Sequence, residues 1–217
     1  MKKVLAVAAF LLLGVSAFAQ WHFGAGFKYE YAPQFVDGKK SLTYDMSGVY
    51  AGASYNIEIT NFGLSLAPGA YVSFVTGTGR DIDGKKEVYR SSVGWLRNGS
   101  RHFSLMIPVH AVYSMDLGPG KAFAYAGPAL ECGMDFRSWS KGYNDLDGHY
   151  KTVSDNYYSK KGYDWRVLDL KMDIGFGYQW KFLQANVGFD WGLIDKDPSQ
   201  SYTLHVHGIH IGAAYVF

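Results

Sequence analysis

Strict alternation of residue types over long stretches is the feature that most constrains what this chain can fold into. The last eleven residues illustrate it. Ile209, Ile211, Ala213, Tyr215 and Phe217 are apolar or aromatic, and the residues between them, smaller or more polar, are Gly208, His210, Gly212, Ala214 and Val216. Successive side chains of a β-strand point to opposite faces, so a period of two predicts a strand with two different environments.

The same alternation divides most of the chain into eight predicted strands. They span residues 21–32, 44–56, 62–75, 103–115, 122–136, 166–178, 183–194 and 202–217. Each is long enough for a tilted membrane strand, which needs about 9–11 residues, whereas strands in soluble proteins average about 5–6 residues. Strand length therefore favours a membrane barrel over a soluble β-sandwich.

The predicted connections alternate in length. Residues 56–61, 116–121 and 179–182 are short turns, whereas 33–43, 76–102 and 137–165 are longer; the short 195–201 breaks the pattern. Outer-membrane barrels have short periplasmic turns and longer extracellular loops. Because hydrocarbon does not tolerate an open sheet edge, the sequence predicts an eight-stranded antiparallel up-and-down transmembrane β-barrel with both termini in the periplasm.

The N-terminus has the pattern of an export signal. Met1-Lys-Lys precedes an apolar run over residues 4–15, which is too short to cross a membrane, and Ala17-Phe-Ala19 matches a cleavage site. We expect a signal peptide over residues 1–19, cleaved after Ala19, and one outer-membrane β-barrel domain over residues 20–217. The expected location is the cell outer membrane.

Composition agrees with this class without deciding it. Aromatic residues make up 17% of the chain, yet the mean hydropathy is only −0.11, as in a barrel with apolar residues facing lipid and polar residues facing inward. A secreted, aromatic-rich β-sandwich has similar values. Of the 21 Lys and Arg residues, two lie in the predicted signal, which leaves 19 against 19 Asp and Glu and gives no argument for nucleic-acid binding.

The inward-facing parity of the predicted strands carries charges of both signs. The residues concerned are Lys28, Glu30, Glu131, Asp135, Asp169, Lys171, Asp173 and Asp190. An eight-stranded barrel is just wide enough for side chains to fill, and a buried charge must be paired. We therefore expect an internal polar network and a plugged core. On the fifth predicted strand, Cys132 and Phe136 should face the lipid.

Several motifs resemble those of a known family. Residues 106–113, Met-Ile-Pro-Val-His-Ala-Val-Tyr, and 123–130, Phe-Ala-Tyr-Ala-Gly-Pro-Ala-Leu, resemble a strand pair of small outer-membrane barrels of Bacteroidetes, the PorT-like or "outer membrane protein beta-barrel" group; residues 64–69 and 189–193 resemble further stretches. The resemblance implies a shape like that of OmpA and OmpX, with no catalytic residue to transfer. The ending Ala-Tyr-Val-Phe217 resembles the signal read by the barrel-insertion machinery.

Candidate sites for chemistry are few. His205 and His207 share a face, and His210 follows, so metal chelation competes with a role as rim histidines; no further ligand can be named. The carboxylates of Glu131, Asp135, Asp169 and Asp173 allow acid–base chemistry or internal salt bridging. No His-x-Ser pair offers an activated nucleophile. We expect no catalytic, cofactor-binding or metal-binding residue and no cofactor.

The long loops 76–102 and 137–165 carry many aromatic residues, which are favoured in binding surfaces. They are Tyr89, Trp95, Tyr143, Tyr150, Tyr157, Tyr158, Tyr163 and Trp165. The leading hypothesis is a non-enzymatic structural or surface-interaction protein. The alternatives are a narrow porin or transport- or secretion-associated barrel, and a lipid-modifying enzyme. The expected partners are outer-membrane lipid, the barrel-insertion machinery and an extracellular ligand or protein at these loops, with no nucleic acid.

Two points stay open at this level. The alternative fold is a lipocalin-like soluble barrel, in which outward residues such as Leu170, Ile174 and Phe189 would be polar. In the last strand, His205 and His207 share the outward parity of Ile209. Either the hydrocarbon band ends near Ile209 or a bulge shifts the register there.

Overall fold

A computed structural model describes residues 19–36, 38–80, 88–91, 94–144, 148–159, 165–197 and 203–217. The elements are β1 (Ala19–Val36), β2 (Lys39–Glu58), β3 (Leu64–Arg80), β4 (Val88–Ser91), β5 (Gly94–Leu117), β6 (Gly120–Asn144), β7 (Gly148–Val153), β8 (Leu168–Trp180), β9 (Leu183–Gly192), β10 (Thr203–Leu204) and β11 (His207–Val216). The predicted signal peptide lies outside this part of the chain except for Ala19. In the described residues, no helix is long and apolar enough to cross a membrane.

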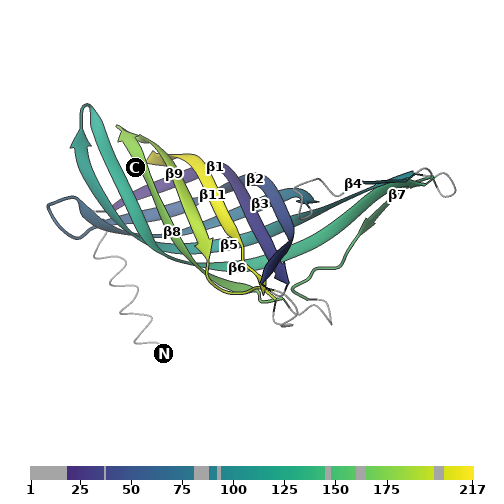
Figure 1. Ribbon diagram of the computed structural model, residues 1–217. Helices are drawn as coiled ribbons and strands as arrows, with labels where there is room; N and C mark the ends of the chain where they lie inside the picture. The colour runs from purple at the N-terminus through teal and green to yellow at the C-terminus, as the bar shows by residue number, and fades with distance from the viewer. Residues whose placement is uncertain are drawn as a thin grey trace, which may run out of the picture.

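Eight of these strands close into a ring. Strands β1, β2, β3, β5, β6, β8, β9 and β11 each pair antiparallel with their neighbours in chain order, and β11 pairs with β1. Figure 1 shows this closed barrel from the side. The predicted eight-stranded antiparallel barrel is confirmed, with strands longer than expected at several ends.

Outward faces of the barrel are apolar and inward faces are polar. In β8 the exposed Leu170, Met172 and Ile174 alternate with the buried Lys171 and Asp173. Phe189 of β9 is also exposed. An apolar surface that surrounds a charged interior is the reverse of a soluble barrel, so the lipocalin-like alternative is wrong.

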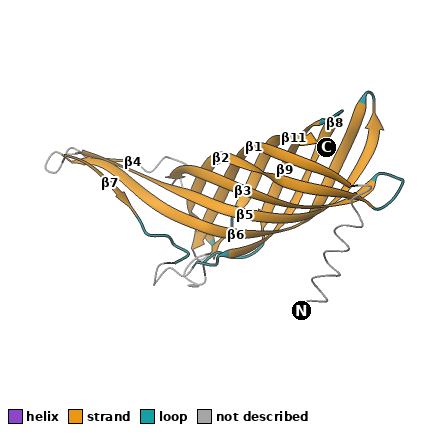
Figure 2. Cartoon of the chain, turned by 180° about the vertical axis from the view of Figure 1, so that it is seen from behind, coloured by secondary structure: helices purple, strands orange, loops and turns teal. Residues whose placement is uncertain are grey.

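Two of the predicted loops are largely β-structure. β5 and β6 pair along their whole length, from Gly94 opposite Asn144 to Leu117 opposite Gly120, and β4 and β7 add to their outer edges. We call β4, β7 and the paired residues 94–102 of β5 and 136–144 of β6 the β arm. Figure 2 shows it projecting beyond the barrel. Residues 76–102 and 137–165 are predicted as long loops, but most of their described residues belong to strands.

The barrel has two distinct ends. β1 begins and β11 finishes at one of them, which we call the terminal end (Figure 1). The β arm extends from the opposite end, which we call the arm end (Figures 1 and 2).

A β-bulge in β6 inverts the predicted faces beyond it. Phe103 pairs with Asp135 and Ser104 pairs with Gly133, which leaves Met134 as the extra residue. A bulge of this kind places two successive residues opposite one and moves the inward parity by one position. Phe136 is consequently buried inside the barrel, and Asp135 turns to the outer face. The predictions that Phe136 faces lipid and Asp135 faces inward are both wrong.

The last strand contains no such shift. Tyr31 pairs with His207, and three residues along each strand Gln34 pairs with Leu204, so β1 keeps one register against β11 and β10. Leu204, Val206, Gly208 and His210 are all buried, which leaves His205 and His207 on the outward parity. Of the two explanations for these histidines, the bulge is excluded, and the apolar outer surface of this strand begins at Ile209.

Inward-facing glycines make room for aromatic rings. A Cβ added to Gly175 or Gly188 would overlap the side chain of Tyr125, and one added to Gly26 or Gly212 would overlap Tyr50. The lumen is narrow, and its large aromatic rings therefore pack against inward-facing glycines, which leave the space that a side chain would fill. This arrangement explains why glycine occurs so often on the inward parity.

Candidate functional site

The lumen is crossed by a layer of paired charges. Lys171 of β8 lies with its Nζ 2.7 Å from Asp190 Oδ1 and 3.0 Å from Glu131 Oε2. Lys28 of β1 lies 2.9 Å from Glu30 Oε1, 3.6 Å from Glu131 and 3.7 Å from Asp190. All five side chains are almost completely buried. Because they project from β1, β6, β8 and β9, their ion pairs bridge the barrel from wall to wall.

Seven of the eight charged residues predicted to face the lumen do so. Beyond the five above, Asp169 is buried near Lys196, and Asp173 is buried with its Oδ2 3.0 Å from His110 Nε2. Asp135 is the exception, because the bulge turns it outward. The predicted internal network is confirmed, and salt bridging accounts for Glu131 and Asp169.

Sequence reasoning missed several members of this network, among them His102, Tyr158 and Lys196. His102 donates a hydrogen bond through Nδ1 to Glu30 Oε2 at 2.8 Å, and its Nε2 lies 3.1 Å from Tyr158 Oη. Lys196 reaches Glu131 at 3.9 Å and Asp169 at 4.0 Å from the connection after β9. His102 and Tyr158 lie in segments read as loops. The alternation of β5, continued by one position past Phe103, would have identified His102.

The connection that carries Lys196 folds over the charged layer. The backbone N–H of Lys196 donates to Leu204 O at 2.8 Å, and the carbonyl of Lys196 accepts from Arg166 N–H at 2.9 Å. Burial lowers the pKa of the Lys196 ammonium below its usual value, against the opposing effect of Glu131 and Asp169. Burial likewise raises the pKa of the Tyr158 hydroxyl well above its usual value.

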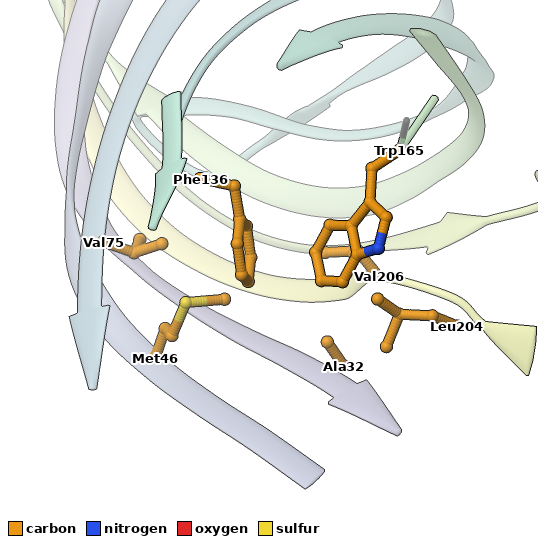
Figure 3. Close-up of a cluster of buried hydrophobic side chains, with 7 residues drawn as sticks. All are labelled: Ala32, Met46, Val75, Phe136, Trp165, Leu204 and Val206. Atoms are coloured by element: carbon orange, nitrogen blue, oxygen red, sulfur yellow. The ribbon is translucent and has the colours of Figure 1, made fainter. Parts of the chain in front are cut away.

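An apolar cap covers the arm end of the charged layer. It consists of Ala32, Met46, Val75, Phe136, Trp165, Leu204 and Val206, with Tyr44, Tyr157 and Tyr158 packed against it. Figure 3 shows the first seven side chains converging from several strands and from the connections that carry Trp165 and Val206. The rings of Phe136 and Trp165 lie 4.8 Å apart, and those of Tyr157 and Trp165 lie 4.9 Å apart.

The cap corrects the expected role of three loop aromatics. Tyr157, Tyr158 and Trp165 were predicted candidates for a binding surface, but they pack on the barrel interior, and Trp165 is only 6% exposed. Tyr163, from the same predicted set, lies outside the described residues. The lumen is therefore closed at the arm end by hydrophobic packing as well as by ion pairs.

A polar cavity of about 100 Å³ lies on the other side of the charged layer. Lys28 of the charged layer is one of its lining residues, and Tyr50, Tyr71 and Tyr125 line it as well. His22 and Gln184, which line it toward the terminal end, are joined by a hydrogen bond of 2.6 Å. The space is enough for a few water molecules, and none of the residues that line it belongs to the apolar cap.

The histidines of the lumen are paired with groups other than serine. His102 bonds to Glu30, His110 pairs with Asp173, His210 bonds to Tyr125 Oη at 2.8 Å, and His22 bonds to Gln184. An activated serine needs a base within hydrogen-bond reach, and none of these contacts supplies one.

His205 and His207 lie on the outer surface near aromatic residues. Their rings are 6.4 Å apart and nearly parallel, and the His207 ring lies 6.1 Å from that of Trp191 and 6.4 Å from that of Phe189. His210 points instead into the lumen. Among the described residues, no group of three or more His, Cys, Asp or Glu side chains is placed to hold a metal ion.

Comparison with known proteins agrees with this architecture. Residues 5–217 match the family model described as outer membrane protein beta-barrel domain. Similar solved structures include Ail of Yersinia pestis (10% identity over 92% of this chain and 99% of that one, TM-score 0.46) and Neisserial surface protein A (13%, 91% and 97%, TM-score 0.41). The outer membrane protease OmpT of Escherichia coli is a further one (10%, 92% and 96%, TM-score 0.28).

At these identities and TM-scores the likeness to solved structures carries no argument about the role of this chain. No curated protein sequence matches the chain. The family model covers nearly the whole sequence, and the ring of paired strands has the apolar exterior that an outer-membrane location requires. This chain belongs to the outer membrane protein beta-barrel domain family.

Proposed function

We propose that this protein is a non-conducting, non-enzymatic outer-membrane barrel that presents the β arm at the cell surface for a structural or interaction role. The observation that carries the proposal is the closure of the lumen by two successive layers, the ion pairs around Lys171 and the apolar cap around Phe136. A barrel that fills its interior in this way leaves the protruding β arm as the feature that an outside partner would meet.

The proposal includes an orientation. Export through a signal peptide over residues 1–19, cleaved after Ala19, would release the N-terminus in the periplasm. The terminal end would then face the periplasm, and the β arm would face outward. The aromatic ending of β11 would be read by the barrel-insertion machinery. Assignment to the PorT-like branch of Bacteroidetes stays a prediction of the sequence motifs.

Conductance in planar lipid bilayers tests the closed lumen. The wild-type protein is expected to give no steady open channel. In the variant Phe136→Ala/Trp165→Ala, which thins the cap, transient openings are expected to stay rare because the ion-pair layer remains. Steady channels from the wild-type protein would refute the proposal and favour the alternative, a narrow porin or a transport- or secretion-associated barrel.

Labelling of intact cells tests the orientation. In a Cys132→Ser background, cysteine placed at the exposed Thr152 of β7 is expected to react with a membrane-impermeant maleimide. Cysteine placed at Asn61, in the turn at the terminal end, is the matched control and is expected to react only after the cells are lysed. The opposite labelling pattern would show the reversed orientation.

The remaining candidate is a lipid-modifying enzyme, for which the outward histidines His205 and His207 are the residues to test. We assign them no catalytic role because no nucleophile is joined to either ring by a described hydrogen bond. The variant His205→Ala/His207→Ala is expected to leave the structure of the cell's lipid A unchanged. A changed acyl chain pattern in mass spectra would overturn this assignment.

A further inference from the structure

The outer face of the β arm carries two pairs of basic residues on neighbouring strands, with an aromatic residue between the two pairs. Arg101 of β5 pairs directly with Arg137 of β6, and further out Lys141 of β6 pairs directly with Lys151 of β7. Trp139 lies on β6 between these two cationic rows. Residues two apart on a strand are separated by about 7 Å. Arg137 and Lys141 are four residues apart on β6, so the two cationic rows are about 13 Å apart.

These residues continue the lipid-facing surface of the barrel. Arg101 has the same parity as the lipid-facing Phe103 and Leu105 of β5, and β5 contains no bulge. On β6, the extra residue Met134 brings Asp135 and Arg137 onto the same outer face. The first cationic row therefore lies immediately beyond the apolar band, at the height where lipid headgroups begin.

Asp135 holds the two arginines in place. Its Oδ2 lies 3.1 Å from Arg101 Nε, and its Oδ1 lies 2.6 Å from Arg137 Nε. Like charges directly opposite each other destabilise a sheet, and the single carboxylate offsets only one of the two positive charges. Each guanidinium has further N–H donors, and both arginine side chains remain 38% exposed.

The second cationic row is less shielded. Lys141 and Lys151 are exposed, and neither forms an ion pair with a residue in the part of the chain that the structure describes. The aromatic row between them is fixed, because the ring of Trp139 lies over Gly99, where a Cβ would overlap it. The result is a face with positive charge at two heights and an aromatic ring between them.

We propose that this cationic face, Arg101, Arg137, Lys141 and Lys151, binds the phosphate groups on the saccharide headgroup of a lipid in the outer leaflet. Paired guanidinium groups suit phosphate, which they contact through several N–H donors at once. The position just beyond the apolar band selects a membrane lipid over a soluble anion, and Trp139 is placed to pack against a sugar ring between two anionic groups. The inference rests on the proposed orientation but not on the closed lumen.

Binding of purified lipid A to the full-length protein in detergent tests the proposal by native mass spectrometry. The wild-type protein is expected to retain phosphorylated lipid A and to bind the dephosphorylated lipid, with the same acyl chains, at least about ten-fold more weakly, as expected for lost charge-assisted hydrogen bonds. R101Q/R137Q is expected to lose a similar factor, and K141Q/K151Q a smaller one. Added salt should weaken binding because exposed charges are screened.

K121Q/K181Q is the matched control, because it removes two exposed lysines at the terminal end and is expected to bind like the wild-type protein. Heat-modifiable gel migration checks that each variant is folded, and R101K/R137K keeps the charges if the glutamine variant does not fold. Equal binding of dephosphorylated lipid, or full binding by R101Q/R137Q, would overturn the proposal. So would complete displacement by inorganic phosphate, which would indicate a site for free anions.

The maleimide labelling at Thr152 and the conductance measurement give separate answers. If the arm labels from outside and R101Q/R137Q binds normally, the lipid site is wrong and the orientation stands. If the arm does not label from outside, the orientation is wrong, and the cationic face cannot meet the outer leaflet. Conducting channels would refute the closed lumen without affecting the lipid site.

Discussion

Asp190 lies directly opposite Asp173 in the ladder between β8 and β9, yet it forms its ion pair with the diagonal residue Lys171, whose Nζ is 2.7 Å from Asp190 Oδ1. Two carboxylates at opposed positions repel each other. The repulsion is relieved because the shortest ion pair of each goes to a different partner, Asp190 to Lys171 and Asp173 to His110, and His210 lies within 4.0 Å of both. The lumen is organised by diagonal and cross-barrel contacts that the strand register alone does not define.

Lys171→Met should destabilise the barrel strongly, because it leaves Asp190 and Glu131 buried with less compensation. Removing one partner of a buried ion pair costs about 3–5 kcal/mol. The double variant Lys171→Met/Asp190→Leu should cost less than the sum of the two single variants. Free energies of unfolding from denaturant titration in lipid vesicles provide the measurement. Lys121→Met, at an exposed position, should stay within about 0.5 kcal/mol of the wild-type protein, and additive effects would argue against direct coupling.

Phe136→Ala should lower the free energy of unfolding by about 3–5 kcal/mol, as expected for a large ring removed from a packed core. The reason is its position in the apolar cap against Trp165 and Met46. Phe62→Ala is the matched control, since Phe62 is 84% exposed in a turn at the terminal end, and it should have little effect. Equal losses for the two variants would contradict the placement of Phe136 inside the barrel.

Gly188→Ala should destabilise the barrel by about 1–3 kcal/mol, because its methyl group would overlap Tyr125 Oη and the ring of His210. Tyr125→Phe removes that hydroxyl and its hydrogen bond to His210. The double variant Gly188→Ala/Tyr125→Phe should therefore be more stable than the two single losses would sum to. The measurement is again the unfolding free energy, and strict additivity would mean that Gly188 is not packed against this ring.

Deleting Met134 should be tolerated, because it removes the bulge while Asp135 stays outward and Phe136 stays inward. The unfolding free energy should change by no more than about 1 kcal/mol, near the centre of the range for single changes. Deleting Cys132 instead should move Met134 to the inward position of Gly133, where the ring of Tyr158 leaves no room. Heat-modifiable gel migration should persist in the first variant and be lost in the second; the reverse would show that the bulge is misplaced.

Much of the fold could be read from local alternation. The eight barrel strands, the antiparallel order and seven of the eight lumenal charges follow from a period of two along each strand, as in the regular alternation from Leu168 to Ile174. Alternation is reliable there because a membrane strand has a uniform apolar environment on one side and a polar one on the other. β8 is the best example, since from Leu168 to Ile174 every residue of one parity is exposed and every residue of the other is buried.

Alternation failed where the outward side left the apolar band and the inward side became the buried cap around Phe136. Beyond the apolar band, the outward residues of β5 and β6 are no longer apolar, so Arg101 and Arg137 looked like loop residues although their strands continue unbroken. His102 was missed for the same reason, whereas Tyr158 lies in a turn outside the strands, where alternation gives no information. Hydrophobic contrast, on which the sequence pattern depends, disappears at the membrane surface although the backbone pairing does not.

The sequence by itself determined that the chain forms a closed membrane barrel and that charges of both signs point into it, because those properties depend on residue type at every second position. Only the tertiary structure decided which way Asp135 and Phe136 face, that the register of β11 continues without a bulge past His207, and that Tyr157, Tyr158 and Trp165 cover the lumen. A bulge is defined by two strands together, and a cap by residues from many strands. Their energies arise from contacts between segments far apart in the chain, which no local pattern records.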